Sequence, residues 1–77
     1  MRDTLRVTEP TEMEIGAQGI RLGQLLKWAG LVPSGGAVKE LLESGVVLVN
    51  GTVETRRGAQ LKPGDTVACG TEVVLLK

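Results

Sequence analysis

The sequence predicts an α+β fold in which two short helices pack on a small, mostly antiparallel sheet. Apolar residues recur with a helical period in two stretches, 22–29 and 37–42. From residue 46 onward, short β-branched runs alternate with turn sequences such as Asn-Gly and Pro-Gly-Asp. At 77 residues the chain is near the lower size limit for a self-sufficient core. We therefore expect an N-terminal lead-in, residues 1–12, followed by a single domain, residues 13–77.

Two short runs before the first helix alternate apolar with polar residues. They are Leu5–Val7 and Met13–Ile15, and this alternation predicts that one or both form edge strands. Pro10 separates the runs, and Gly16 and Gly19 bracket a turn ahead of the helix.

The first helix is predicted from four apolar residues with i, i+3, i+4 and i+7 spacing, which places them on one face. These residues are Leu22, Leu25, Leu26 and Ala29. Gly30 stands where a left-handed C-terminal cap is needed, and Pro33 prevents the helix from continuing.

A second face of this helix carries Arg21, Gln24 and Trp28, while Lys27 is expected to point away from both faces. A lone tryptophan beside an apolar stripe is more often partly buried core than a contact surface. Because Trp28 shares its face with Arg21, it is also a candidate for stacking on a nucleobase. Both interpretations stay open.

The second helix is predicted to begin after Ser34, because a serine hydroxyl at the N-cap accepts a hydrogen bond from a first-turn amide. Gly45 is expected to end it in a left-handed conformation. The buried stripe is expected to consist of Ala37, Val38, Leu41 and Leu42, which leaves Lys39, Glu40 and Glu43 in water.

Short strands and tight turns are predicted for the rest of the chain. Val46–Val49 is too short for a helix, and Asn50-Gly51 favours a type I′ turn because both positions need positive φ. Thr52 and Val53 begin the return strand. The remaining elements are a basic loop at Thr55–Gly58, a turn at Lys62–Asp65, and a hairpin of Thr66–Cys69 and Glu72–Leu76.

The composition disfavours an enzyme. A domain of this size has little volume for an enclosed active site. The chain has no histidine and one cysteine, Cys69, which excludes Cys/His zinc sites and Ser-His-Asp triads within it. We expect a non-catalytic protein without a cofactor or metal. The sequence has neither a signal-peptide-like run nor an apolar stretch near the ~20 residues needed to span a membrane. A cytoplasmic monomer with no membrane partner is therefore expected.

The net charge is zero, but the charges are unevenly distributed. Residues 21–62 carry six basic and three acidic groups, whereas residues 1–20 have a net charge of −2 and residues 63–77 of −1. A balanced total can therefore hide a basic face in the middle of the chain.

Two polar segments are candidate phosphate contacts. Ser34-Gly35-Gly36 stands at a predicted helix N-terminus, where free amides and close backbone approach suit an anion, although a simple cap and turn is the commoner explanation. Arg56-Arg57 lies in a glycine-flanked loop and offers forked guanidinium groups, or else forms a solvated turn. Arg21 and Lys39 have the same ambiguity, since Lys39 can pair with Glu43 one turn later.

These pieces occur in an order that resembles a known family. The order is Arg21-Leu22, Leu25, Gly30-Leu31, Ser34, Ala37, Leu41-Leu42, Gly45, Val47, Val49-Asn50-Gly51 and Pro63-Gly64-Asp65. Over residues 13–69 it resembles the RNA-binding domain named after small-subunit ribosomal protein four, the S-four domain, with its alpha-L motif. The chain is most similar to the small stand-alone bacterial members.

The resemblance implies a module that binds structured RNA, ribosomal or transfer RNA, through phosphate and shape contacts, with ribosomal particles as further partners. The implied contact residues are Arg21, Ser34, Gly35, Gly36, Lys39, Asn50, Arg56 and Arg57. Many members have arginine directly after the serine, where this chain has Gly35. The alternative is a protein-interaction or ribosome-associated accessory module that keeps the fold and binds RNA weakly or not at all.

Overall fold

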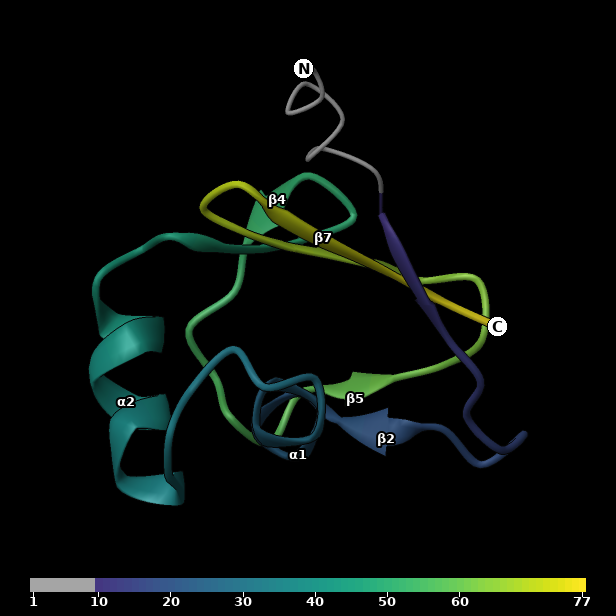
Figure 1. Cartoon of the computed structure of the whole chain (residues 1–77), viewed down its shortest axis with the longest axis horizontal. Helices are drawn as coiled ribbons and strands as arrows, with labels where there is room; N and C mark the ends of the chain where they lie inside the picture. The colour runs from purple at the N-terminus through teal and green to yellow at the C-terminus, as the bar shows by residue number, and fades with distance from the viewer. Residues whose placement is uncertain (1–9) are drawn as a thin grey trace, which may run out of the picture.

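A computed structural model describes residues 10–77, in which a sheet lies over a layer formed by two helices (Figure 1). The five-stranded sheet has the order β1-β7-β6-β3-β4, and a second sheet pairs β2 with β5. The helices are α1, Leu22–Trp28, and α2, Gly35–Glu43. The strands are β1, Thr11–Met13; β2, Ile20–Arg21; β3, Val47–Val49; β4, Thr52–Val53; β5, Gln60–Leu61; β6, Thr66–Cys69; and β7, Glu72–Leu76. The predicted α+β class is confirmed.

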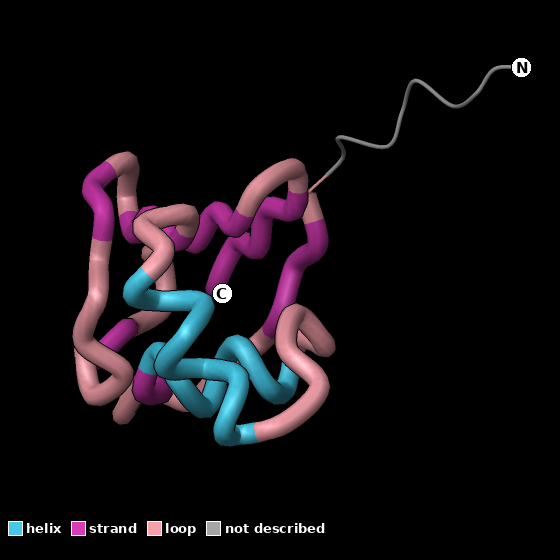
Figure 2. Tube along the Cα trace, turned by 90° about the vertical axis from the view of Figure 1, so that its left-hand side faces the viewer, coloured by secondary structure: helices cyan, strands magenta, loops and turns pink. Residues whose placement is uncertain are grey.

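The helices cross at a steep angle, since α1 is seen end-on and α2 from the side in Figure 1. Figure 2 shows both helices together beneath the strands of the larger sheet. The start of α2 therefore lies beside α1, and the short strands β2 and β5 flank α1 on its other side. This arrangement positions the polar segments described below.

The large sheet is mostly antiparallel, as predicted. Only β1 with β7 is parallel among its strand pairs within residues 10–77. Asn50 has a φ of 53° and Gly51 a φ of 86°, the two positive values that the predicted type I′ turn requires. The predicted hairpin of β6 and β7 is also present.

The first strand of the described residues, β1, lies two residues earlier than predicted. It spans Thr11–Met13 rather than Met13–Ile15, because its register is set by pairing with β7, where Met13 meets Leu76. It is an edge strand as expected. The predicted turn follows, with the Gly19 amide donating to the Gly16 carbonyl at 2.9 Å. The other candidate strand, Leu5–Val7, lies outside the described residues.

The sheet of β2 and β5 was not predicted from the sequence. Each strand has two residues, which is too short for an alternation pattern to appear. The pairing joins Ile20 to Leu61 and Arg21 to Gln60. It thereby brings the segment after the basic loop alongside the start of α1.

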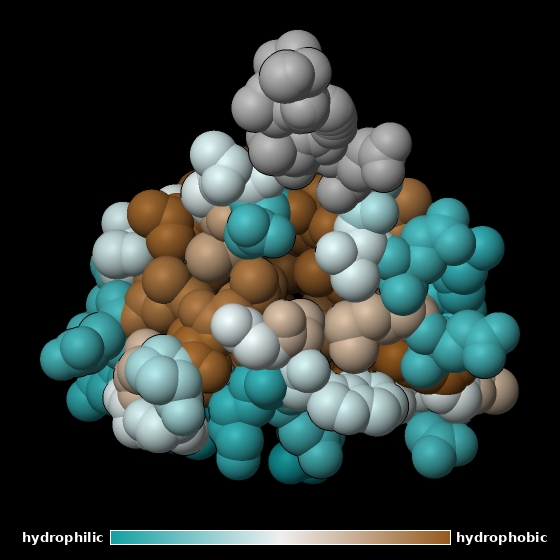
Figure 3. Space-filling view, in the orientation of Figure 1, coloured by the Kyte–Doolittle hydropathy of each residue, from teal (hydrophilic) through white to brown (hydrophobic). Residues whose placement is uncertain are grey.

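The core follows the predicted helical stripes. Leu22, Leu25 and Leu26 of α1 are completely buried, and Val38 and Leu42 of α2 are nearly so. Ala37 and Leu41 are half-buried at the edge of the same core. Figure 3 shows apolar residues filling the space between the sheet and the helices, with hydrophilic residues along the lower border where α1 lies.

The helix ends lie where the sequence predicts them, but one predicted hydrogen bond is absent. Gly30 and Gly45 have φ values of 75° and 80°, as left-handed caps require. Ser34 is the N-cap of α2, but the prediction that its hydroxyl caps the helix is wrong. The Ala37 amide, which a capping hydroxyl would bind, donates instead to the Ser34 carbonyl at 3.2 Å.

Candidate nucleic-acid interface

The basic loop 55–58 and the next residue, Ala59, are attached to the first turn of α1 by two main-chain hydrogen bonds. The Gly23 amide donates to the Arg57 carbonyl and the Leu22 amide donates to the Ala59 carbonyl, both at 2.9 Å. The first amides of a helix have no partner within the helix, so they bind whatever acceptor lies nearby. Here the carbonyl groups of residues 57 and 59 are the acceptors, which holds Arg57 beside the helix start.

Gly23 permits this close approach. A Cβ atom at position 23 would lie 3.3 Å from the Arg57 carbonyl oxygen, 3.4 Å from the Arg57 Cβ and 3.5 Å from a methyl group of Val38. The first distance is tighter than most real Cβ contacts. Glycine therefore lets α1, α2 and the loop meet at one point.

A groove of about 370 Å³ lies at this meeting point. Three of its lining residues carry a positive charge: Arg21 from β2, Lys27 from α1 and Arg57 from the loop. The other lining residues are Gly23, Gln24, Gly35, Val38 and Gly58. None of these lining residues is acidic, and within residues 10–77 none of the three cations has a salt bridge. We call this the cationic groove.

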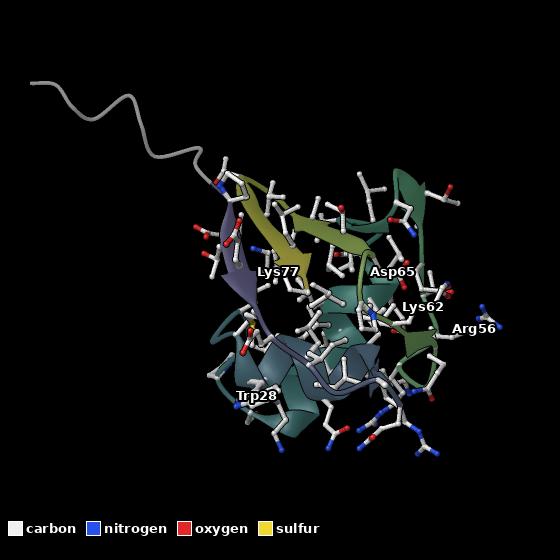
Figure 4. All side chains as sticks on the ribbon, turned by 90° about the vertical axis from the view of Figure 1, so that its right-hand side faces the viewer. Trp28, Arg56, Lys62, Asp65 and Lys77 are labelled. Carbon is white, nitrogen blue, oxygen red and sulfur yellow. The ribbon has the colours of Figure 1, made fainter. Side chains whose placement is uncertain are left out.

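The neighbouring arginines of the loop differ in their partners. Arg57 lines the cationic groove, whereas Arg56 forms a two-pronged ion pair with Glu54, with Nε to Oε2 at 3.0 Å and Nη2 to Oε1 at 3.1 Å. The hydrogen bond from the Arg56 side chain lowers the pKa of Glu54 to about 2, and the same bond raises the pKa of Arg56. Figure 4 shows Arg56 projecting into solvent on the side opposite Trp28.

Asn50 lies outside the cationic groove, and both ends of its amide are engaged. Its Nδ2 donates to Asp65 Oδ1 at 3.1 Å, and its Oδ1 accepts from the Thr66 amide at 2.9 Å. Asp65 is buried and also accepts from the Lys62 amide at 3.0 Å. That backbone bond, followed by the bond from Asn50, lowers the pKa of Asp65. We call this set the Asn50–Asp65 clamp.

The remaining predicted residues lie near the groove to different degrees. Gly35 lines it, but Ser34, Gly36 and Lys39 do not, although all three are exposed around the start of α2. Of the eight predicted residues, the structure therefore brings Arg21, Gly35 and Arg57 together in one groove.

Five of the eight residues that line the groove were not predicted as contacts, and they include Val38 and Gly58. Gly23 and Gln24 line it without having been proposed, and Lys27, expected to point away, lines it too. A Cβ built on Gly35 would lie 3.8 Å from Lys27 Cδ, so the start of α2 lies over the lysine stem. Helical spacing places positions 23, 24 and 27 on one face of α1, but it does not show that α2 and the loop meet at that face.

Comparison with known proteins identifies the family of this chain. A sequence model of the S4 domain matches residues 13–77. The chain belongs to the S4 domain family. It is also similar to the probable ribosome maturation protein RlbA of Bacillus subtilis (strain 168), with 44% identity over 55 residues, covering 71% of this chain and 78% of the relative. The predicted resemblance to the S-four domain is thereby confirmed. Within residues 10–77, no helix is long and apolar enough to cross a membrane.

Proposed function

We propose that this protein binds structured RNA without catalysing a reaction, and that the cationic groove contacts the RNA phosphates. The observation that carries the proposal is the convergence of Arg21, Lys27 and Arg57 on one groove that no acidic residue lines. One guanidinium group can bind two oxygens of a phosphate through two parallel hydrogen bonds. A nearby carboxylate would compete with the phosphate for these donors. Membership of the S4 domain family supports the RNA-binding part of this proposal.

The RNA is proposed to be ribosomal, bound during ribosome maturation. The support is the relative from Bacillus subtilis, which is named a probable ribosome maturation protein. The three cations come from a strand, a helix and a loop, so they match a fixed arrangement of phosphates rather than a flexible strand. A-form RNA is commonly recognised in this way, through shape and backbone contacts.

The test compares wild type with two arginine variants of the same loop. Arg57→Gln removes a cation from the groove, and Arg56→Gln removes the neighbouring cation that Glu54 already pairs. With labelled ribosomal RNA hairpins, we expect Arg57→Gln to weaken binding roughly 3- to 10-fold, about 1 kcal/mol. The slope of log affinity against log salt should become shallower by about 0.7 to 0.9, the value for one phosphate contact. The Arg56→Gln variant should stay within about twofold of wild type.

Two outcomes would contradict the proposal. Equal losses in both variants would show that general charge, rather than the groove, determines binding. Absence of wild-type binding to ribosomal RNA and to ribosomal subunits would favour the other candidate, an accessory module that contacts a protein. The zero net charge of the chain and Gly35 in the groove favour that candidate.

A further inference from the structure

A second hollow of about 670 Å³ continues along α1 from the cationic groove. The two share Gln24 and Lys27 as lining residues, so a ligand can extend from one into the other. The apolar lining of the second hollow is Ile15, Ile20 and Trp28, and its polar lining is Glu14, Gln18, Gln24 and Lys27, with Gly16 and Gly19 completing it. We call it the Trp28 hollow.

Trp28 is held at the surface instead of packing in the core. Its relative exposure is 63%, whereas the three leucines of α1 are at 0%. It is the only aromatic residue of the chain. The helix end beneath it is fixed by the Ala29 amide, which donates to Leu25 at 2.8 Å, and by the Leu31 amide, which donates to Leu26 at 3.0 Å. The indole is therefore an apolar ring on a rigid base, available to a ligand.

The two hollows differ in charge, so one suits a phosphate group and the other suits a nucleobase. The cationic groove has three cations and no acidic lining residue, which suits a phosphate. The Trp28 hollow has the carboxylate of Glu14 beside the shared Lys27, so its lining charges balance, and two side-chain amides complete its polar lining. A carboxylate repels phosphate but accepts hydrogen bonds from the amino groups of a base. The Trp28 hollow thus suits a neutral, planar, hydrogen-bonding ligand.

The spacing along α1 is also suitable. Arg21 lies just before α1 and Trp28 is the last residue of this helix, whose seven residues span about 10 Å along the axis. Successive nucleotides of one strand advance by about 3.4 Å along a duplex axis, so this distance corresponds to about three nucleotides. A base that remains paired and stacked has no free face for the indole. Only an unpaired base near the bound phosphates can reach it.

We propose that the Trp28 hollow binds one unpaired nucleobase of the RNA held by the cationic groove, stacked on the indole. This inference rests on the proposed RNA-binding function and adds its substrate class: structured RNA with an extrahelical base. Stacking on one aromatic side chain contributes about 1 to 3 kcal/mol per base, or roughly 5- to 100-fold in affinity. The neighbouring amides and carboxylate would contact the edge of the base.

The experiment measures the binding of wild type and of one variant to two RNA hairpins that differ at a single position. The probe is a labelled ribosomal RNA hairpin with a single unpaired adenosine, compared with the same hairpin carrying an abasic site there. Trp28→Leu keeps an apolar residue with good helix propensity but removes the ring. We expect this variant to lose roughly 5- to 100-fold in affinity for the adenosine hairpin and less than twofold for the abasic one. Thermal unfolding checks that Trp28→Leu remains folded.

Fluorescence supplies a second measurement, because Trp28 is the only tryptophan and the chain has no tyrosine. Stacking should quench its emission with the adenosine hairpin and leave it nearly unchanged with the abasic one. Binding of both hairpins with equal affinity, or equal losses for both in Trp28→Leu, would overturn the base site and leave the proposed function standing. A shift in Trp28 emission caused by a protein partner in the absence of RNA would overturn it in favour of protein docking. Failure of every hairpin to bind would overturn the proposed function itself.

Discussion

The Asn50–Asp65 clamp and the cationic groove are both polar, turn-rich regions, but their side chains have opposite relations to the rest of the fold. In the clamp, the Asn50 amide and the Asp65 carboxylate bind each other and the backbone of residues 62 and 66. In the groove, Arg21, Lys27 and Arg57 have no carboxylate partner within residues 10–77. The clamp uses its polar groups to hold the fold, whereas the groove leaves them available to a ligand.

The same contrast separates neighbours in the sequence. Arg56 and Arg57 are adjacent and chemically identical, yet Glu54 pairs with Arg56 and the groove contains Arg57. Internal partners therefore distinguish a structural polar residue from a candidate contact better than residue type does. Substitutions in the clamp, in the groove and in the Glu54–Arg56 pair test this rule.

The largest expected effect is on stability, in Asn50→Ala. The substitution removes hydrogen bonds to buried Asp65 and to the Thr66 amide, and it places alanine at a φ of 53°. We expect a loss of about 3 kcal/mol in the free energy of unfolding, of which about 1 kcal/mol comes from the positive φ. For a domain of this size the melting temperature should fall by on the order of 15 °C.

Asn50→Gly is the matched control, because glycine accepts the positive φ but still lacks the amide. It should lose about 2 kcal/mol and bind RNA as tightly as wild type below its melting temperature. The opposite result, unchanged stability with weakened RNA binding, would return Asn50 to the interface and break the comparison.

A smaller effect is expected on RNA affinity, which should increase when the groove gains a cation. A Cβ on Gly35 would meet only Lys27 Cδ, at the ordinary contact distance of 3.8 Å, so Gly35→Arg should be tolerated. We expect RNA affinity to increase roughly three- to fivefold and the salt dependence to steepen by about 0.7 to 0.9. Both would be measured by titration of a ribosomal RNA hairpin at two salt concentrations.

Gly36→Arg is the control for this gain, because Gly36 is next in the chain, is exposed and does not line the groove. A Cβ there would lie 3.9 Å from Ser34 Oγ, which is also an ordinary contact. An equal gain from both variants would mean that net charge, not position in the groove, sets the affinity.

Local patterns predicted most of the fold because they act within a few residues. The stripe of Leu22, Leu25 and Leu26, the Asn50-Gly51 turn and the glycine caps follow from periodicity and backbone preference alone. The β2–β5 pairing could not be predicted, since two-residue strands far apart in the chain have no periodicity.

The candidate site was predicted less completely, because it is formed by residues that are far apart in the chain. Arg21, Gly35 and Arg57 carry chemical signals of their own, but Lys27 belongs to the groove only because α2 begins over its stem. Asn50 and Arg56 looked equivalent to the groove residues until their partners Asp65 and Glu54 were known. Such partnerships depend on tertiary structure, which residue type and spacing do not specify.

The smallest expected effect concerns the ion pair that separates Arg56 from Arg57. The pKa of Glu54 in the folded protein is about 2, below its ordinary value of 4.5, so the folded state binds this proton less readily than the unfolded state. The contribution of the pair to stability is therefore complete above about pH 4.5 and is lost as the pH falls through 2. Glu54→Gln should be slightly less stable than wild type at pH 7, and the difference should shrink as the pH falls toward 2 and vanish below it.

Thermal unfolding of both proteins across that pH range measures the stability difference, and taking the difference cancels the titration of Asp65 that both share. At pH 7 the same variant leaves Arg56 without its carboxylate partner. If a missing internal partner makes a cation available, Glu54→Gln should bind ribosomal RNA slightly more tightly, by less than about threefold. This gain should disappear in the double variant Glu54→Gln/Arg56→Gln. A gain that persists there would show that Glu54 acts on the RNA by its own charge, and that pairing is not what separates Arg56 from Arg57.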